Sequence, residues 1–410
     1  MKRLAASTYN IVRTVGTIFE REDKLTLEST PFIHEKGGDS CMTLKFKTRE
    51  AVTHIAPYVL GKTLSDLQKE HGLSSIRKLS ENENIYGCSP KVKQWFKENG
   101  SDLFLYPDGA AVELSHKVAT FLGVPKEQLV FGNGSDEVIR LLTRAYLSSG
   151  DEAIMADVTF PRYQTNVSLE GGTPVIVPLV NGTHDLQAMH DQITPNTKLI
   201  FVCNPNNPTG TIVGKKELLQ FIESVPSHIL VVVDEAYMEY VTTDDYLETL
   251  PLLSAFENLI VLRTFSKIYG LAGLRVGFGV MNEEVAEQLR KVKDVFNVNT
   301  VAQKSAIIAL EDQAFIRECT HKNERGRLFL EGEFDRLGVS YFPSQSNFIM
   351  VDTGLNGDTV SYELVKRGLV VRSGTLLGYP TTVRVTIGTE EDNKRFIQAL
   401  EDILQSEGVK

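Results

Sequence analysis

The chain has 410 residues, of which 42% are hydrophobic and 23% charged, and its formal net charge is −10. This length predicts two or three domains, and the composition is that of an ordinary globular protein. A net acidic chain without basic clusters argues against sequence-independent nucleic-acid binding, and no apolar run approaches the roughly 20 residues of a membrane span.

The N-terminal region is expected to lie outside the folded domains. Polar residues interrupt the apolar stretch of residues 1–19, which argues against a signal peptide. Because these residues carry three basic side chains and no acidic one, a transit peptide stays an alternative. We interpret residues 1–41 as a disordered extension ahead of a start at Met42. Residues 42–80 are predicted to form an arm that contributes to the smaller of two domains.

The middle of the chain alternates short β-rich runs with helical stretches. The runs are 153–155, 174–178, 199–203, 229–233 and 259–262. They are continuously apolar, so both faces of each strand should be buried, which is typical of a mostly parallel sheet flanked by helices. Residues 81–295 are therefore predicted to form a large α/β domain.

The last third of the chain predicts a smaller α+β domain over residues 296–410. Its helices are expected over 301–310, 321–337 and 391–405, and its strands over 341–352, 370–372 and 383–387.

Polar clusters follow three of the predicted strands in the large domain. They cover residues 204–210, 234–237 and 263–267. Ligands of open α/β sheets bind outside the carboxyl ends of the strands. We therefore expect the three clusters to converge on one pocket.

The third cluster contains the most specific candidate for catalysis. Lys267 is preceded by hydroxyl residues and followed by a glycine-containing turn that ends at Arg275. Hydroxyls and an arginine bind phosphate, and a lysine beside a phosphate site is the arrangement of a Schiff-base cofactor. A surface lysine that caps the strand is the alternative.

The other clusters supply partners for such a cofactor. Asp234 ends an apolar strand and needs a partner, which is either a helix N-terminus or the protonated pyridine nitrogen of a cofactor that acts as an electron sink. Tyr237 and Asn207 can both reach the phenolic oxygen of that ring, and a core tyrosine and a turn-rich loop are their alternatives. Residues 132–137 precede a predicted helix, whose first backbone amides can bind phosphate.

In this order and spacing, the motifs resemble those of the fold-type I aminotransferases of class I/II, which use pyridoxal 5'-phosphate (PLP). The resemblance extends over residues 46–404 and includes the triplet Asn82-Glu83-Asn84. Within this family the chain is most similar to the group that acts on histidinol phosphate. It departs from the family pattern at Ile85 and Cys88, where prolines are common.

The resemblance implies a role for each cofactor-binding residue. Lys267 holds the cofactor covalently and moves a proton, Asp234 pairs with the pyridine nitrogen, and Phe160 stacks on the ring. Tyr237 and Asn207 bind the phenolic oxygen. The remaining residues at the cofactor, most of them at its phosphate, are Gly134, Ser135, Asp136, Thr264, Ser266 and Arg275. Tyr106 is implied to reach the phosphate in the neighbouring subunit, so that a homodimer shares its active sites.

The resemblance also implies substrate-binding residues. Arg384 matches the arginine that clamps a substrate carboxylate, Arg372 matches a second arginine, and Tyr58 resembles a tyrosine that touches substrate. A surface ion pair is the alternative for each arginine. The implied reaction transfers the amino group of L-histidinol phosphate to 2-oxoglutarate, giving imidazole acetol phosphate and L-glutamate in histidine biosynthesis.

Three other functions stay open. They are an aromatic amino acid aminotransferase, a threonine-phosphate decarboxylase of the same fold, and a non-catalytic PLP-binding regulator. Such regulators carry a DNA-binding domain ahead of the fold, and residues 1–45 show no clear helix-turn-helix. The cysteines at 41, 88, 203 and 319 are scattered, which predicts reduced thiols in a cytoplasmic protein and no metal site.

Overall fold

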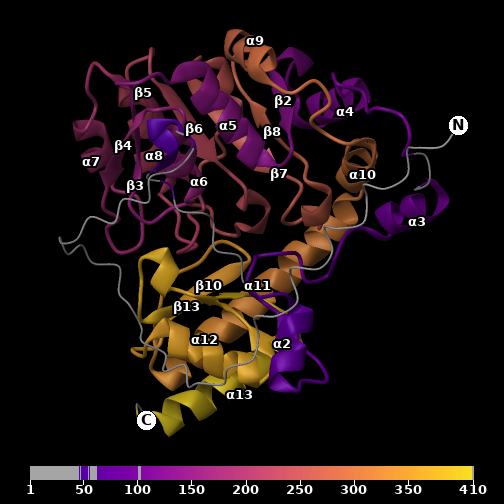
Figure 1. Ribbon diagram of the computed structural model, residues 1–410, viewed down its shortest axis with the longest axis vertical. Helices are drawn as coiled ribbons and strands as arrows, with labels where there is room; N and C mark the ends of the chain where they lie inside the picture. Colours follow the sequence, from indigo (N-terminus) through magenta and orange to yellow (C-terminus); the bar gives the residue numbers. More distant parts are fainter. Residues whose placement is uncertain (1–45, 47, 54, 56–61, 100–102, 409–410) are drawn as a thin grey trace, which may run out of the picture. The chain divides into compact units, whose positions relative to one another are not determined.

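The computed structural model describes residues 46, 48–53, 55, 62–99 and 103–408 (Figure 1). The extension expected at residues 1–41 and the candidate Tyr58 lie outside these residues. All elements described below belong to the unit that begins at Thr48. The first of them is the short helix α1 (Glu50–Thr53). None of the helices in this part of the chain carries the long apolar stretch that would take it across a bilayer.

A seven-stranded sheet forms the centre of the larger domain (Figure 1). In spatial order its strands are β2 (Leu129–Gly132), β8 (Gly277–Val280), β7 (Leu259–Thr264), β6 (Leu230–Asp234), β5 (Thr197–Cys203), β3 (Glu152–Ala156) and β4 (Thr173–Val177). The strands from β7 to β4 run parallel, and β8 is antiparallel to both of its neighbours. The predicted mostly parallel sheet is confirmed. The ends of each predicted run differ from the ends of an observed strand by at most two residues.

Successive side chains of these strands pack against two different helix layers, because they point to opposite faces of the sheet. On β5, Ile200 and Val202 belong to one core and Leu199 and Phe201 to the other. The first core includes α3 (Pro90–Asn99), α4 (Val112–Leu122), α7 (Leu186–Asp191), α8 (Lys215–Ser224) and α10 (Thr300–Glu311); the second includes α5 (Ser135–Tyr146), α6 (Arg162–Leu169) and α9 (Glu283–Val292). This double cover explains the continuously apolar strands.

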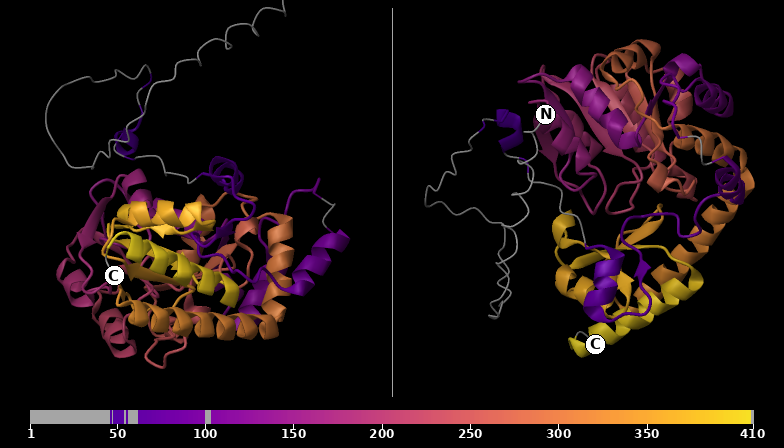
Figure 2. Two further views of the ribbon diagram at one scale, coloured as in Figure 1. Left: turned by 90° about the horizontal axis from the view of Figure 1, so that it is seen from below. Right: turned by 45° about the vertical axis from the view of Figure 1, so that its right-hand side comes forward.

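A second, antiparallel sheet lies in the C-terminal part of the chain. Its strands are β12 (Arg372–Ser373), β13 (Thr382–Thr386), β10 (Phe348–Asp352) and β9 (Ser340–Tyr341). Its core includes α11 (Gln313–Leu337), α12 (Gly357–Lys366) and α13 (Glu390–Ser406), which lie side by side in Figure 2. The pairing of β1 (Arg77–Lys78) with β11 (Leu369–Val370) joins the segment after α2 (Leu64–His71) to this part.

Short 3-10 helices complete the fold at the loops. They are η1 (Lys126–Gln128), η2 (Met238–Tyr240), η3 (Leu250–Ser254), η4 (Ala272–Leu274) and η5 (Thr375–Leu377).

Three boundaries expected from the sequence are wrong. Residues 341–352 are not one strand, because the hydroxyl of Ser344 bonds the carbonyl of Phe348 and closes a turn between β9 and β10. Residues 370–372 divide between two sheets, since β11 pairs with β1 and β12 with β13. Helix α11 begins at Gln313 rather than at 321, because no glycine or proline interrupts the intervening residues.

Candidate active site

A cavity of about 760 Å³ lies where the loops after β5, β6 and β7 face the small sheet. The three polar clusters predicted from the sequence contribute Asn207, Asp234, Tyr237, Thr264, Ser266 and Lys267 to its lining. The small sheet contributes Arg372 and Arg384. This volume is in the range of sites that hold a cofactor together with a small substrate.

Lys267 follows the end of β7, where a buried strand fixes the position of its backbone. Its Nζ donates to the carbonyl oxygen of Glu81 at 3.1 Å and lies 5.4 Å from the centre of the Tyr237 ring. Burial, reinforced by the positive charge of Arg384, lowers the pKa of Lys267 to about 8. The neutral amine, which is the nucleophilic form, is therefore accessible near neutral pH.

Asp234 is the last residue of β6 and is 3% exposed. One carboxylate oxygen accepts from the hydroxyl of Tyr163 at 2.7 Å and the other from the backbone N–H of Ala236 at 3.1 Å. Burial raises the pKa of this carboxyl to about 6, although both hydrogen bonds oppose the shift. No α-helix begins at Asp234, so the helix-cap alternative is wrong. A cationic N–H in the cavity would favour its ionised form.

Tyr237 and Asn207 each have one polar atom already engaged by the protein. The Tyr237 hydroxyl oxygen accepts from Nδ2 of Asn82 at 3.1 Å, which leaves the tyrosine's own hydrogen to be donated. Arg384 donates to Oδ1 of Asn207, so the amide nitrogen is the end of Asn207 that remains a donor. Two donors on adjacent loops suit one phenolic oxygen.

The start of α5 and the turn after Lys267 form an anion cradle. Gly134 has φ +78°, and a Cβ there would lie 2.4 Å from Nη2 of Arg275. Arg275 donates to Oγ of Ser266 at 3.2 Å, and the hydroxyl of Thr264 accepts from the N–H of Ser266 at 3.1 Å. A helix N-terminus and a guanidinium are both positive and would repel each other unless an anion lay between them. Ser135 is the first residue of α5, and its N–H belongs to this cradle. The arrangement fits the phosphate of PLP.

The loop ahead of α6 supplies the wall on another side. Phe160 lines the cavity and makes an edge-on contact with Tyr163 at 5.6 Å between ring centres. Asp136 also lines the cavity, but its carboxylate is paired with Nε of Arg162 at 3.1 Å. Its negative charge is therefore partly neutralised beside the phosphate cradle.

The two predicted substrate arginines are direct neighbours across the ladder between β12 and β13. Arg384 is 6% exposed and donates to the carbonyl of Ser80 at 2.7 Å, which contradicts a surface ion pair. Arg372 lies 3.9 Å from a carboxylate oxygen of Glu81. Like charges directly opposite each other destabilise a sheet. Both side chains line the cavity, so an anionic substrate group bound there would relieve the repulsion.

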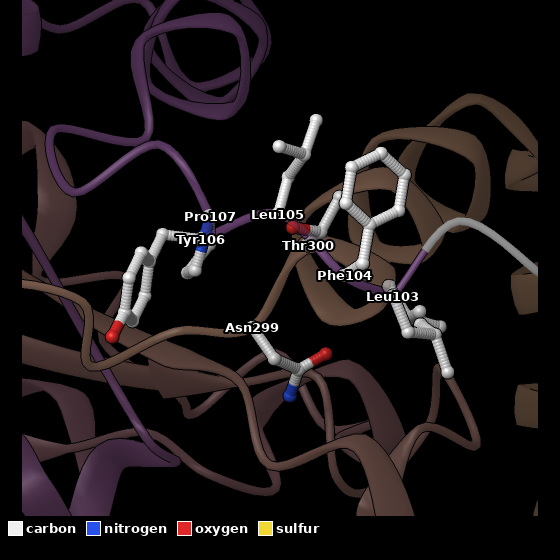
Figure 3. A pocket seen from close by; sticks show the side chains of 8 residues that line it. Leu103, Phe104, Leu105, Tyr106, Pro107, Asn299 and Thr300 are labelled. Atoms are coloured by element: carbon white, nitrogen blue, oxygen red, sulfur yellow. The ribbon is translucent and has the colours of Figure 1, made fainter.

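Tyr106 is the candidate that the structure does not bring to this cavity. It is 81% exposed and stacks on Phe296 with 4.7 Å between ring centres. Together with Leu103, Phe104 and Leu105 it lines a different cavity, of about 310 Å³, against the start of α10. In Figure 3 the side chains of Tyr106 and Phe104 extend to opposite sides of this segment.

Sequence reasoning missed two residues that hold the predicted ones in place. Asn82, the first residue of the triplet, has φ +58° and is 1% exposed, and its side-chain amide donates to the hydroxyl of Tyr237. Tyr163 is fully buried and binds Asp234. Tyr163 lies three residues after Phe160 and contacts its ring edge-on, so its proximity to a predicted cofactor residue was a signal already present in the sequence.

A lysine of lowered pKa, a buried carboxylate and an anion cradle, arranged at the carboxyl edge of a mostly parallel sheet, define a PLP-dependent enzyme of fold type I. The chain belongs to the aminotransferase class I and II family, whose model matches residues 74–400.

Proteins similar to this chain include named enzymes. A histidinol-phosphate aminotransferase of Geobacillus sp. (strain WCH70) is 49% identical over 351 residues, which cover 86% of this chain and 96% of the relative. That of Moorella thermoacetica is 45% identical over 373 residues, or 91% and 97% of the two chains.

Two solved structures confirm the fold. Histidinol-phosphate aminotransferase from Sinorhizobium meliloti in complex with pyridoxal-5'-phosphate has a TM-score of 0.81 and 24% identity, with 90% of this chain and all of that chain covered. An aspartate aminotransferase double mutant of Thermus thermophilus has a TM-score of 0.75 and 21% identity, with 88% and 100% covered.

Proposed function

We propose that this protein transfers the amino group of L-histidinol phosphate to 2-oxoglutarate, giving imidazole acetol phosphate and L-glutamate in histidine biosynthesis. The observation that carries the proposal is the Arg372–Arg384 pair, which lines the same cavity as Lys267. Planar guanidinium groups bind both phosphate and carboxylate, and the two substrates present these groups in turn. The relatives named for this reaction cover nearly the whole chain after its N-terminal region.

PLP, when bound, supplies an electron sink for the carbanion at the substrate Cα. The neutral amine of Lys267 would take the proton from the substrate Cα and deliver it to the cofactor carbon that receives the amino group. Asp234 accepts a hydrogen bond from the pyridine nitrogen and keeps that nitrogen protonated, while Tyr163 holds the carboxylate. Tyr237 and Asn207 donate to the phenolic oxygen.

Other residues fix the position of the cofactor in this proposal. The backbone amides of Gly134 and Ser135 and the side chains of Thr264, Ser266 and Arg275 bind the phosphate, with Asp136 beside them. Phe160 covers the ring. Residues 81–295, together with α10, whose side chains pack in a core of the large sheet, form the cofactor-binding domain. The small domain brings Arg372 and Arg384 to the substrate on β12 and β13.

The active form in this proposal is a cytoplasmic homodimer. Leu103, Phe104, Leu105 and Tyr106 are consecutive and between 67% and 83% exposed, and contiguous exposed apolar residues mark protein interfaces. Tyr106 then reaches the cofactor phosphate of the partner subunit. The free thiols of Cys88, Cys203 and Cys319 support a reducing compartment.

The test uses the PLP-loaded protein without 2-oxoglutarate. Histidinol phosphate, phenylalanine and O-phosphothreonine are added separately, and the visible absorption of the cofactor and carbon dioxide release are followed. We expect histidinol phosphate to bleach the absorption far faster than phenylalanine does. Equal bleaching by both would indicate a dual-specificity enzyme, and carbon dioxide from O-phosphothreonine would indicate a decarboxylase. No response to any of the three would contradict the proposed substrate.

A further inference from the structure

Two leucines form an aliphatic surface on one wall of the active-site cavity. Among the described residues that line the active-site cavity, Leu376 and Leu377 are the only leucine, isoleucine or valine side chains. Both belong to η5, which begins three residues after Arg372. Leu376 is 65% exposed, so most of its apolar surface faces solvent in the described chain. Covering that surface with an apolar part of a ligand would be favourable.

The turn that carries the leucines is held firmly. The carbonyl of Gly374 accepts from the N–H groups of Leu377 at 2.8 Å and Tyr379 at 3.0 Å, and the N–H of Gly374 donates to the carbonyl of Thr382 at 2.8 Å. A Cβ on Gly374 would lie 1.9 Å from Oγ1 of Thr382, which leaves no room for any other residue. The leucines therefore belong to a shaped wall and not to a loose loop.

The far end of the turn also packs against the large domain. Gly378 has φ +84°, and a Cβ there would lie 2.7 Å from Cγ2 of Val158. The ring of Tyr379 contacts that of Phe342 with 5.0 Å between centres. Because the turn is anchored at both ends, its leucines keep a fixed position relative to the arginine pair.

We propose that Leu376 and Leu377 form the wall that receives the imidazole ring of histidinol phosphate. This inference rests on the proposed function and adds the residues that determine specificity. The substrate amine must reach Lys267, and its phosphate is bound by Arg372 and Arg384, so the ring needs an apolar surface beside both. The other apolar lining residues, such as Phe160 and Ala236, lie beside the cofactor-binding groups. Glutamate has no ring, so it depends less on the leucines.

The test measures the two half-reactions separately. The PLP-loaded protein reacts with histidinol phosphate or with glutamate, and kcat/KM is taken from the change in cofactor absorption. For Leu376→Ala we expect kcat/KM for histidinol phosphate to fall about tenfold, the usual effect of removing apolar contacts from a substrate side chain, while the value for glutamate changes less than about twofold. Leu376→Met keeps the apolar volume and should restore most of the loss.

A second readout separates the ring from the phosphate. Inorganic phosphate competes for the arginine pair and has no ring, so its inhibition constant should be the same in Leu376→Ala and in the unchanged protein. The matched control is Leu328→Ala on α11, where the leucine is 55% exposed and does not line the cavity. It should leave both half-reactions unchanged.

The outcomes are distinguishable. Equal losses for histidinol phosphate and glutamate, or no loss for either, would overturn the role of the leucines while the proposed function stands. Failure of the unchanged protein to react with histidinol phosphate would overturn the function itself, and the wall with it.

Discussion

Lys267 combines a fixed backbone position with an amine that loses its proton easily. Burial and the nearby charge of Arg384 lower its pKa to about 8, and the neutral form therefore predominates above that pH. In cofactor-free protein we expect the rate of covalent PLP attachment to rise with pH through a midpoint near 8. A simple alkyl amine, measured under the same conditions, should show a midpoint near about 10. A protein midpoint as high as that of the free amine would contradict the lowered pKa.

Removal of the same amine should abolish transamination. We expect Lys267→Ala to lower turnover by at least about 1000-fold, because both nucleophile and proton carrier are lost. PLP should still bind, more weakly, through the phosphate cradle, and dialysis should remove it. Lys198→Ala is the control, since Lys198 has a side chain 40% exposed and pairs only loosely with Asp151 at 4.0 Å. Appreciable turnover in Lys267→Ala would refute the assignment of Lys267.

Asp234 carries a cost in the cofactor-free protein. Burial raises the pKa of this carboxyl from 3.8 to about 6, so the ionised carboxylate destabilises the folded state above pH 6. This destabilisation disappears below about pH 4, because the group is then protonated in both the folded and the unfolded state. We expect Asp234→Asn to raise the unfolding free energy of cofactor-free protein by up to about 3 kcal/mol at pH 7. The gain should be smaller at pH 5, as measured by urea unfolding at both pH values.

The control for this prediction is Asp191→Asn, whose side chain is 62% exposed and should change the unfolding free energy little at either pH. The same Asp234→Asn change should impair transamination, since the pyridine nitrogen loses its anionic partner. A destabilised cofactor-free variant at pH 7 would show that the hydrogen bonds from Tyr163 and Ala236 outweigh the burial of charge.

At the level of elements, a substitution at the start of α5 tests whether this segment binds the cofactor phosphate. Gly134→Ala would introduce a Cβ 2.4 Å from Nη2 of Arg275 at a residue with φ +78°. The new Cβ would displace Arg275 from the phosphate, and a cost of about 1–3 kcal/mol to binding would raise the PLP dissociation constant by at least about fivefold. Gly332→Ala on α11, where a Cβ meets nothing within 4 Å, should leave PLP affinity unchanged. Unchanged affinity in Gly134→Ala would place the phosphate elsewhere.

The elements that the sequence predicted are those defined by local patterns. The strands from β3 to β7 are short apolar runs, and polar clusters follow three of them, which is a pattern visible without knowledge of the fold. The turn between β9 and β10 was not predicted, because the serine hydroxyl that closes it looks like any polar residue in a strand. Likewise, β11 and β12 separate only because they find partners in different sheets.

At the level of the whole molecule, the missed part of the site consists of contacts between distant segments. Asn82 and Tyr237 are 155 positions apart, and Asn207 and Arg384 are 177 apart. No local pattern reports such pairs. The residues at the ends of strands could be predicted because the sheet itself gathers them, whereas Asn82 and Leu376 reach the cavity only through the packing of the small sheet against the large one.

The proposed homodimer makes a prediction about how two defective subunits combine. In a heterodimer of Lys267→Ala and Tyr106→Ala subunits, one site has the intact Lys267 of one chain and the intact Tyr106 of its partner, while the other site lacks both. Heterodimers isolated with two different tags should therefore regain about half of the normal activity at limiting PLP, although each parent is defective. Tyr362→Ala, which removes a tyrosine 55% exposed on α12, should resemble the unchanged protein. No recovery in the heterodimer would mean that each site is built from a single chain.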